Sequence, residues 1–350
     1  MNLRLLDSGE VIARHVPTQN SRGEKTSAKL FKYDSRGELI ANPLGETLHT
    51  MGSISVDAQQ RILTVFTNYD YGRPYPERQP YPRVCRALSS DGSADLSFGN
   101  GGGCVDAEDV RYGDTLAAHQ VPSGGVLVGW TGSARLIQWT DSGVRDPHFG
   151  TDGVVSLGEI VALTSFAIQS DGRILAATSA YNGRDRKVVR LTPSGELDPS
   201  FGSGGSLTEE GWIRKRTDDS FFAVSGGLLR RYLPDGSLDV TFGSGGVVDL
   251  HEATGGAEAD EFGVHQIAED RAGRLYVGAG WRRSSSESGE TQGVLMTRLT
   301  SDGAIDPAFG VRTDFGQPIG SIASILEGAD GKIWVSFSTS SEPGLMLLWP

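Results

Sequence analysis

Short apolar runs separated by glycine-containing turns recur along the whole chain. The clearest copies read AIQSDGRILAATSAY from Ala167, EDRAGRLYVGAGW from Glu269 and EGADGKIWVSFST from Glu327. Four weaker copies begin at Leu5, Asp57, Val121 and Arg216. Branched and aromatic residues favour strands, and Asp-Gly or Ser-Gly supplies the positive φ that a tight hairpin needs. We therefore predict a β-hairpin at each copy, and little helix, since no stretch keeps an apolar period of 3.6 residues.

A second hairpin motif alternates with the first and ends in a Phe-Gly pair. Its copies are LSSDGSADLSFGNGGGCV from Leu88, WTDSGVRDPHFGTDGVV from Trp139, LTPSGELDPSFGSGGSL from Leu191, YLPDGSLDVTFGSGGVV from Tyr232 and LTSDGAIDPAFG from Leu299. A decayed copy, YDSRGELIANPLG, begins at Tyr33. Each repeat therefore holds two hairpins, or four short strands.

The repeat length predicts the architecture. Gly9 and Gly331, the turn glycines of the first and last copies, lie six repeats apart, which gives a period of about 54 residues. Four strands in such a period, repeated about seven times, are typical of a β-propeller. We predict an all-β, seven-bladed β-propeller of four-stranded antiparallel blades, forming a single domain. The expected blades span residues 1–50, 51–113, 114–161, 162–211, 212–262, 263–318 and 319–350.

The last repeat is shorter than the others. It has the first hairpin and then a single apolar run, GLMLLWP, so the chain holds about 27 strands rather than 28. A propeller must bring its first and last blades together or leave two open sheet edges. We therefore expect Leu3–Leu6 and Leu345–Trp349 to lie close together. The pattern leaves open which terminal strand completes the last blade.

The strings LDPSFGSGG and LDVTFGSGG, each preceded by PSG or PDG, resemble the delta-60 repeat family of bacterial proteins. The resemblance extends from about Lys29 to Gly310 by the Phe-Gly motif, and to Trp349 by the first hairpin motif. It implies a propeller-type fold and carries no assigned chemistry.

Composition and charge exclude several classes of partner. Glycine makes up 48 of 350 residues, about twice the usual share, whereas proline is scarce at 15, which fits recurring turns rather than disorder. The net charge of −12 argues against a nucleic-acid partner and against an anionic membrane surface. No run of 18 apolar residues occurs, so we expect no membrane insertion. The first residues, MNLRLLDSGEVIARHV, lack the apolar core of a signal peptide.

The residues that repeat are interpreted as structural. An aspartate stands three residues before each Phe-Gly pair, at Asp95, Asp146, Asp198, Asp239 and Asp306. Such residues could be five calcium ligands, but a side chain copied in nearly every blade more simply caps turn N–H groups. We expect the phenylalanines to fill the space between neighbouring sheets. The glycine after each phenylalanine allows a bulge or a close backbone approach.

Function is expected where the repeats differ. In a four-stranded meander the turns within hairpins lie at one end of the strands, and the longer links lie at the other. Variable loops on a rigid scaffold commonly carry binding sites, so we assign the binding face to the link side. Residues 67–83, TNYDYGRPYPERQPYPR, include Tyr69, Tyr71 and Tyr75 and are typical of a recognition loop or of a loop packed over its own blades. Residues 281–293 are interpreted as flexible.

Aromatic residues also recur where the second strand of a blade meets the link side. They are Tyr69, Trp130, Tyr181 and Trp281. These side chains either ring one mouth of a central channel, where they would bind sugars or peptide side chains, or pack between blades.

One acidic link, DLHEATGGAEADEFGVH, contains Asp260 and Glu261. Its carboxylates suit Ca²⁺, but their spacing matches no calcium-binding motif, so a solvated loop is the favoured interpretation. We therefore expect no cofactor, with Ca²⁺ as the lesser alternative.

Catalytic motifs are absent from the sequence. No histidine has metal-ligand spacing, and no nucleophile elbow or phosphate loop occurs. His119 and His265 fall near innermost strands and are interpreted as packed imidazoles. Cys85 and Cys104 are interpreted as free, buried thiols rather than a bridge.

The sequence favours a non-catalytic binding module or scaffold that recognises a protein or carbohydrate through aromatic and acidic loops on one face. The alternative is a propeller enzyme with a metal-assisted hydrolase or lyase site at the central channel. A structural unit of a surface assembly is a further option. We expect a cytoplasmic monomer by default, with non-classical export or cell-surface association as the alternative.

Overall fold

The structure is a computed structural model. It describes residues 2–15, 29–41, 53–68, 81–106, 115–131, 134–158, 161–180, 186–209, 211–255, 259–285, 289–316, 319–339 and 343–349. The chain forms two compact units. Unit 1 comprises Met1–Lys25, Tyr33–Ile40 and Arg214–Pro350, and unit 2 comprises Thr26–Lys32 and Ala41–Ile213.

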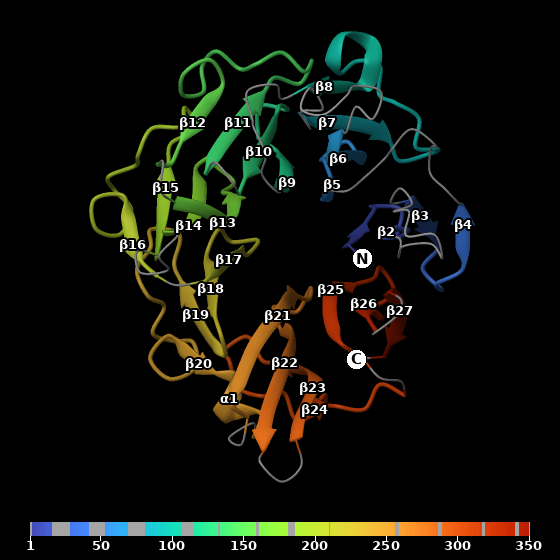
Figure 1. Ribbon diagram of the computed structural model, residues 1–350, viewed down its shortest axis with the longest axis vertical. Helices are drawn as coiled ribbons and strands as arrows, with labels where there is room; N and C mark the ends of the chain where they lie inside the picture. Colours follow the sequence, from blue (N-terminus) through green and yellow to red (C-terminus); the bar gives the residue numbers. More distant parts are fainter. Residues whose placement is uncertain are drawn as a thin grey trace. The chain divides into compact units, whose positions relative to one another are not determined.

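Seven antiparallel sheets account for the strands of the described residues, and each sheet is a meander in which consecutive strands pair (Figure 1). Blade 1 consists of β1 (Asn2–Leu5), β2 (Val11–His15), β3 (Lys29–Tyr33) and β4 (Leu39–Ala41). Blade 2 consists of β5 (Ile54–Val56), β6 (Arg61–Asn68), β7 (Tyr81–Leu88) and β8 (Cys104–Asp106). Blade 3 consists of β9 (Thr115–Gln120), β10 (Val126–Trp130), β11 (Arg135–Trp139) and β12 (Val154–Ser156).

The other four sheets follow in chain order. Blade 4 consists of β13 (Val161–Ile168), β14 (Ile174–Ala180), β15 (Arg186–Leu191) and β16 (Ser206–Thr208). Blade 5 consists of β17 (Trp212–Lys215), β18 (Phe221–Ser225), β19 (Leu228–Tyr232) and β20 (Val247–Asp249). Blade 6 consists of β21 (Glu261–Glu269), β22 (Leu275–Ser285), β23 (Gly289–Leu299) and β24 (Val311–Arg312). Blade 7 consists of β25 (Ser321–Glu327), β26 (Ile333–Ser338) and β27 (Pro343–Leu348).

The chain is thus an all-β, seven-bladed β-propeller with mostly four-stranded antiparallel sheets. The described residues include two short helical elements, η1 (Gly99–Gly103) and α1 (Leu250–Ala253). The described residues form 27 strands, as predicted, and blade 7 is the short blade with three of them. The expected proximity of the terminal segments is confirmed as well, since Leu3, Trp334 and Leu345 belong to one hydrophobic cluster of unit 1.

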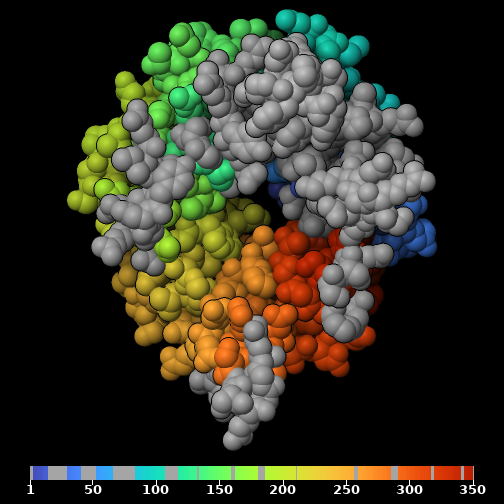
Figure 2. Space-filling view, in the orientation of Figure 1, coloured from blue at the N-terminus to red at the C-terminus, as the bar shows by residue number. Residues whose placement is uncertain are grey.

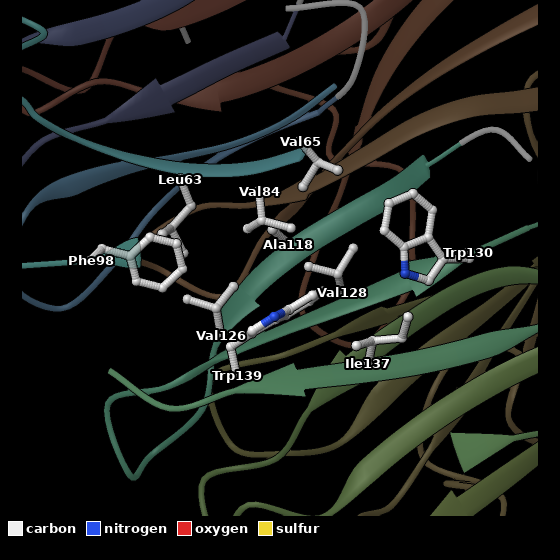
Figure 3. Packing of buried hydrophobic residues seen from close by; sticks show 10 residues of the cluster. All are labelled: Leu63, Val65, Val84, Phe98, Ala118, Val126, Val128, Trp130, Ile137 and Trp139. Carbon is white, nitrogen blue, oxygen red and sulfur yellow. The ribbon is translucent and has the colours of Figure 1, made fainter. Parts of the chain in front are cut away.

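The cores lie where apolar faces of consecutive sheets meet. In unit 2 one cluster joins β6 and β7 of blade 2 to β9, β10 and β11 of blade 3, with Trp130 and Trp139 among its largest members (Figure 3). In unit 1, β21 of blade 6 contacts β25 of blade 7, and the surfaces of the two blades meet in Figure 2. Burial of these apolar faces is the main contribution to stability.

The phenylalanine of the Phe-Gly motif is buried in blades 2 to 6, and the motif contacts the following blade in three of them. The five phenylalanines Phe98, Phe149, Phe201, Phe242 and Phe309 are all buried. In three blades the glycine after phenylalanine donates its N–H to a carbonyl in the turn of the following blade. These bonds are Gly99 to Ser142 at 3.0 Å, Gly150 to Ser194 at 2.8 Å and Gly243 to Asp302 at 2.7 Å. At Gly303, whose φ is +95°, a Cβ would meet the Gly243 nitrogen at 2.9 Å, so the close approach requires glycine.

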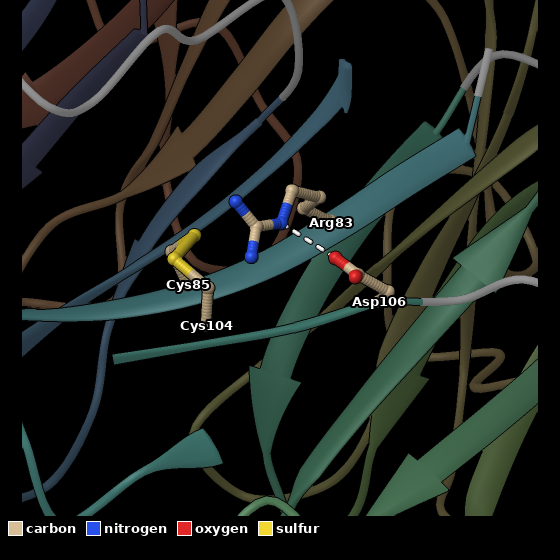
Figure 4. Close-up of a disulfide and its surroundings, with 4 residues drawn as sticks. All are labelled: Arg83, Cys85, Cys104 and Asp106. Carbon is tan, nitrogen blue, oxygen red and sulfur yellow. Dashed lines mark hydrogen bonds and ion pairs between the residues drawn. A yellow bond between two sulfur atoms is a disulfide. The ribbon is translucent and has the colours of Figure 1, made fainter. Parts of the chain in front are cut away.

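The prediction of free thiols is wrong, because Cys85 and Cys104 form a disulfide (Figure 4). The two cysteines are direct partners in the register of β7 and β8, with Cα atoms 4.1 Å apart. That distance lies just short of the usual disulfide range. The number of cysteines alone does not reveal such a pairing, which depends on the register of two strands. Beside the disulfide, Arg83 Nε donates to Asp106 Oδ1 at 2.5 Å.

Candidate functional site

The predicted aromatic residues differ in where they lie and in whether the structure describes them. Tyr69, Tyr71, Tyr75 and Tyr181 lie outside the described residues. Trp130 is fully buried in the core cluster between blades 2 and 3, so its proposed place on an exposed rim is wrong. β10 is buried along its whole length, which leaves Trp130 no access to solvent. The alternative of packing between blades holds for this residue.

Trp281 lies on a long β-hairpin at the link end of blade 6. The prediction of a flexible link is wrong for the described part of residues 281–293, because β22 and β23 stay paired out to Ser285 and Gly289. Each of these strands has 11 residues, whereas the described middle strands of the other blades have 5 to 8. The hairpin therefore extends blade 6 beyond its neighbours within unit 1.

The Trp281 side chain is half-buried and held in place by its partners. It lies opposite Phe262 on β21 and opposite Gly293 on β23. A Cβ on Gly293 would meet the indole ring at 2.6 Å, so the ring lies directly on the glycine backbone. An aromatic ring fixed in this way is preorganised for contact with a ligand.

The two predicted acidic residues are at the same end of blade 6. Asp260 is exposed, and its carboxylate accepts the Ser284 N–H at 2.5 Å, which joins the link to the hairpin. Glu261 is exposed and forms an ion pair with Arg282 at 3.7 Å. The structure thus brings Trp281, Asp260 and Glu261 together. Within the described part of the chain, no group of three or more histidine, cysteine or acidic side chains could hold a metal ion.

The repeated aspartates cap turns, as predicted, and also bind arginine. One oxygen of each accepts the backbone N–H two residues on, as Asp198 does from Ser200 at 3.1 Å. The other oxygen accepts from a side chain on the third strand, as Asp198 does from Arg190 at 2.8 Å. The Arg190 guanidinium lies over the Phe201 ring, 4.8 Å from its centroid. The same arrangement of arginine, aspartate and phenylalanine occurs in blades 2, 5 and 6.

Sequence reasoning missed this arginine, although the sequence carries its signal. An arginine stands five residues before the turn glycine at Arg190, Arg231 and Arg298, and six before it at Arg86. In blade 3 the place is taken by Gln138, whose amide donates to Asp146 at 2.7 Å. The repeated polar residues are therefore engaged in the scaffold.

Inner strands of unit 1 carry two arginines that repel each other. The pKa of Arg4, on β1, is lowered to about 10, first by burial and then by the nearby Arg214 of β17. Burial also lowers the pKa of Arg214, while Glu269 opposes that effect. His265 of β21 stands at a β-bulge, and its Nδ1 accepts the Ile322 N–H at 3.4 Å. Burial lowers the pKa of His265, as expected for the predicted packed imidazole.

No helix of the described residues is long and apolar enough to cross a membrane.

Comparison with known proteins supports the fold. A family model described as "Domain of unknown function (DUF5122) beta-propeller" matches residues 169–201 and 219–242, in blades 4 and 5. No curated protein matches the sequence.

Several solved structures are similar over nearly the whole chain. A Lactobacillus plantarum protein has a TM-score of 0.60 at 12% identity, covering 97% of this chain and 94% of that one. Virginiamycin B lyase from Staphylococcus aureus has a TM-score of 0.56 at 12% identity, covering 100% and 94%. A periplasmic gluconolactonase from Pseudomonas aeruginosa has a TM-score of 0.53 at 12% identity, covering 96% and 98%. At such identities the likeness concerns the fold and not the chemistry.

Proposed function

We propose that this chain is a non-catalytic binding module that recognises a protein or carbohydrate at the link end of blade 6. The observation that carries the proposal is the long β22–β23 hairpin with the fixed Trp281 ring. Tryptophan and arginine are the residue types that contribute most to binding at interfaces. Here the half-buried Trp281 stands next to the exposed side chains of Arg282 and Arg283.

Charge of both signs lies at the same end of the hairpin as this tryptophan. Arg283 is on the same face of the sheet as Trp281, whereas the Glu261–Arg282 ion pair is on the other face, and Asp260 joins the link to the hairpin through the Ser284 N–H. An apolar ring within a polar rim is the usual anatomy of a binding site for a protein or for a sugar. The repeated carboxylates, by contrast, are bonded to the turns and, in blades 2, 4, 5 and 6, to an arginine of their own blade.

The proposal is tested by screening the immobilised protein against a glycan array and a random-peptide display library. Binders should lose at least about tenfold in affinity with Trp281→Ala, as expected for a central aromatic contact. Trp349→Ala is the matched control, because Trp349 is also in unit 1, is 70% exposed and follows β27 at the opposite end of the strands. Binders that are equally affected by both variants, or by neither, would contradict the assignment.

We also propose that all the repeats are of the delta-60 type. The shared positions of the turn glycine, the capping aspartate and the buried phenylalanine in blades 2 to 6 support this. A repeat profile built from these blades that failed to retrieve delta-60 sequences would argue against it.

The Cys85–Cys104 disulfide favours an oxidising compartment over the cytoplasm as the place where the chain works. Thiol titration of protein isolated from its native host without reductant should then find both cysteines blocked. Two reactive thiols would favour the cytoplasm.

A further inference from the structure

We infer that a cavity at the turn end of blade 5, the end of the strands where the hairpin turns lie, is a binding site for a guanidinium group. The cavity has a volume of about 470 Å³ and is in unit 1. Its charged lining residues are Arg216, Asp218, Arg231, Asp239 and Asp302. The site is at the opposite end of the strands from Trp281, and the inference is independent of the function proposed above.

Ser220, which lines the cavity, stands at a position where blades 2 and 4 have an arginine. In blade 4 the first hairpin turn is closed by Gln169 N–H to Arg173 O at 2.8 Å. The same bond in blade 5 runs from Arg216 N–H to Ser220 O at 2.8 Å. Ser220 therefore occupies the position of Arg173. In blade 2 the corresponding residue is Arg61, which accepts from the Asp57 N–H at 3.0 Å.

Strand register confirms that these positions are equivalent. Two residues after Arg173, Leu175 pairs with Arg190 of the third strand. Two residues after Ser220, Phe222 pairs with Arg231 of the third strand. The side chain of Ser220 thus lies on the same face of its sheet as the arginine and aspartate of blade 5, as Arg173 does in blade 4.

The other blades show what group fills this position. In blade 4, Asp198 Oδ2 accepts from two guanidiniums, Arg190 Nε at 2.8 Å and Arg173 Nε at 2.9 Å. In blade 5, Asp239 Oδ2 accepts from Arg231 Nε at 2.7 Å and from no second guanidinium of the described residues. The aspartate keeps its acceptor capacity while its second donor is missing.

Blade 2 shows that one guanidinium can join two carboxylates of neighbouring blades. Arg61 Nη1 donates to Asp95 Oδ2 at 3.4 Å, and Arg61 Nη2 donates to Asp141 Oδ1 at 3.1 Å, in the turn of blade 3. In unit 1 the cavity is lined by Asp239 of blade 5 and by Asp302 in the turn of blade 6. Asp302 stands one position after the equivalent of Asp141, which is Ser301 in blade 6. A guanidinium in the cavity would therefore be placed between the capping aspartate and a different turn carboxylate of the neighbouring blade.

The arginines already present do not take this role. Arg216 directs its guanidinium to Glu269 of blade 6, with Nε 3.0 Å from Oε1, and its Nη1 donates to Asp218 at 3.0 Å. Arg231 Nη1 donates to the Ser301 carbonyl at 2.5 Å. Both guanidiniums are thus neutralised by carboxylates or engaged with carbonyls, which disfavours an anion as the ligand. With three carboxylates and two guanidiniums in its lining, the cavity keeps a net charge of −1 for a cation.

A guanidinium fits this site better than an ammonium. Its planar fork of donors can contact two carboxylates at once, as Arg61 does, whereas an ammonium acts as a point charge. Leu233 and Pro234 form an apolar part of the lining against which an alkyl chain can pack. The ligand is therefore either an arginine side chain of a partner protein or a free guanidino compound.

Isothermal titration calorimetry of the whole chain tests this inference. Agmatine represents a free guanidino compound, and the peptide acetyl-Gly-Arg-Gly-amide represents an arginine of a partner. Cadaverine and the lysine form of the peptide are the ammonium controls. We expect saturable millimolar binding of at least one guanidinium probe, about tenfold tighter than that of its ammonium control. Tighter binding of the peptide assigns the site to a partner's arginine, and tighter binding of agmatine assigns it to a free compound.

Two variants locate the binding. Ser220→Arg supplies the missing guanidinium from within the chain and should abolish binding of both probes. Asp302→Asn removes an exposed carboxylate of the cavity and should weaken binding about tenfold, even if Ser220→Arg fails to fold. Asp314→Asn is the charge-matched control, because Asp314 is exposed in the same unit and does not line the cavity. Absence of saturable binding, equal affinity for ammonium probes, or unchanged binding in Asp302→Asn would overturn the inference.

Discussion

Blades 4 and 5 carry the same repeat motif and differ in the basic side chains of the first hairpin turn, where Gln169 and Arg173 correspond to Arg216 and Ser220. In blade 4 the capping aspartate Asp198 binds Arg190 and Arg173. In blade 5 its counterpart Asp239 binds Arg231 but has Ser220 where the second arginine would be. The backbone hydrogen bonds of the two turns are the same, yet a cavity lies next to Ser220 in blade 5. A repeat scaffold can therefore gain a site through a change of side chains at one hairpin turn.

The comparison also separates the shared structural residues from the variable ones. Phe201 and Phe242 are buried beneath Arg190 and Arg231 in the same way, with ring centroids 4.8 and 4.6 Å from the guanidinium carbons. In both blades the phenylalanine, the arginine and the capping aspartate form the same arrangement. The charges at the edge of the turn are free to vary, because they contribute little to the burial of apolar surface.

The largest loss of stability is expected from truncating the buried phenylalanine of either blade. Phe201→Ala and Phe242→Ala should each lower the free energy of unfolding by about 3–5 kcal/mol, through lost burial and a cavity. Urea denaturation of the two variants measures this. Val240→Ala is the control, because Val240 is 67% exposed and should change stability by less than about 0.5 kcal/mol. A loss below about 1 kcal/mol in either phenylalanine variant would show that the blades do not share this role.

A smaller effect should distinguish the two aspartates. The pKa of Asp198 is lowered to about 2, first by the Ser200 hydroxyl and then, against the opposing effect of burial, by the Ser200 N–H and Arg190. Asp198→Asn should cost roughly 1.5–3 kcal/mol at neutral pH, since it removes hydrogen bonds to a charged group. Asp239→Asn should cost less, because Asp239 lacks the second guanidinium.

The pH dependence of stability provides a second test of the role of Asp198. Because the folded pKa of Asp198 lies below its usual value, its ionised form stabilises the fold above about pH 4, and this contribution is lost as the pH falls towards about 2. As the pH falls from about 4 to about 2, the free energy of unfolding of Asp198→Asn should therefore decrease less than that of the wild type. Urea midpoints at several pH values check this, and parallel curves for the two proteins would contradict it.

The smallest change in stability is expected from exchanging Arg173 of blade 4 and Ser220 of blade 5 for each other's residue type. Arg173→Ser imitates blade 5 in blade 4 and should destabilise by at most about 1 kcal/mol, because the Arg173 side chain is 40% exposed. Ser220→Arg imitates blade 4 in blade 5 and should stabilise by a similar amount. Thermal denaturation of both variants provides the measurement. Destabilisation by Ser220→Arg would mean that loss of the buried Ser220 hydroxyl, which donates to Asp218, outweighs the gain from the new guanidinium.

Local sequence predicted the blades well and their chemistry less well. The hairpin pattern predicted 27 strands and the buried phenylalanines because both depend on neighbouring residues. The disulfide was missed because it depends on the register of β7 and β8. The sequence left open whether Trp130 lies on a rim or packs between blades, because its position along β10 says nothing about the blade that covers it. The extended hairpin near Trp281 was read as a loop, since its polar and serine-rich residues do not alternate.

The sequence by itself determined the seven-fold repeat, the position of each turn and the residues that fill the space between sheets. These features follow from dihedral preferences and from apolar periodicity, which act over a few residues. Only the tertiary structure decided which charges meet, because Asp239 and Asp302 are 63 residues apart and line one cavity through the packing of two blades. Electrostatic and steric complementarity between distant residues depends on that packing, and a local pattern does not contain it.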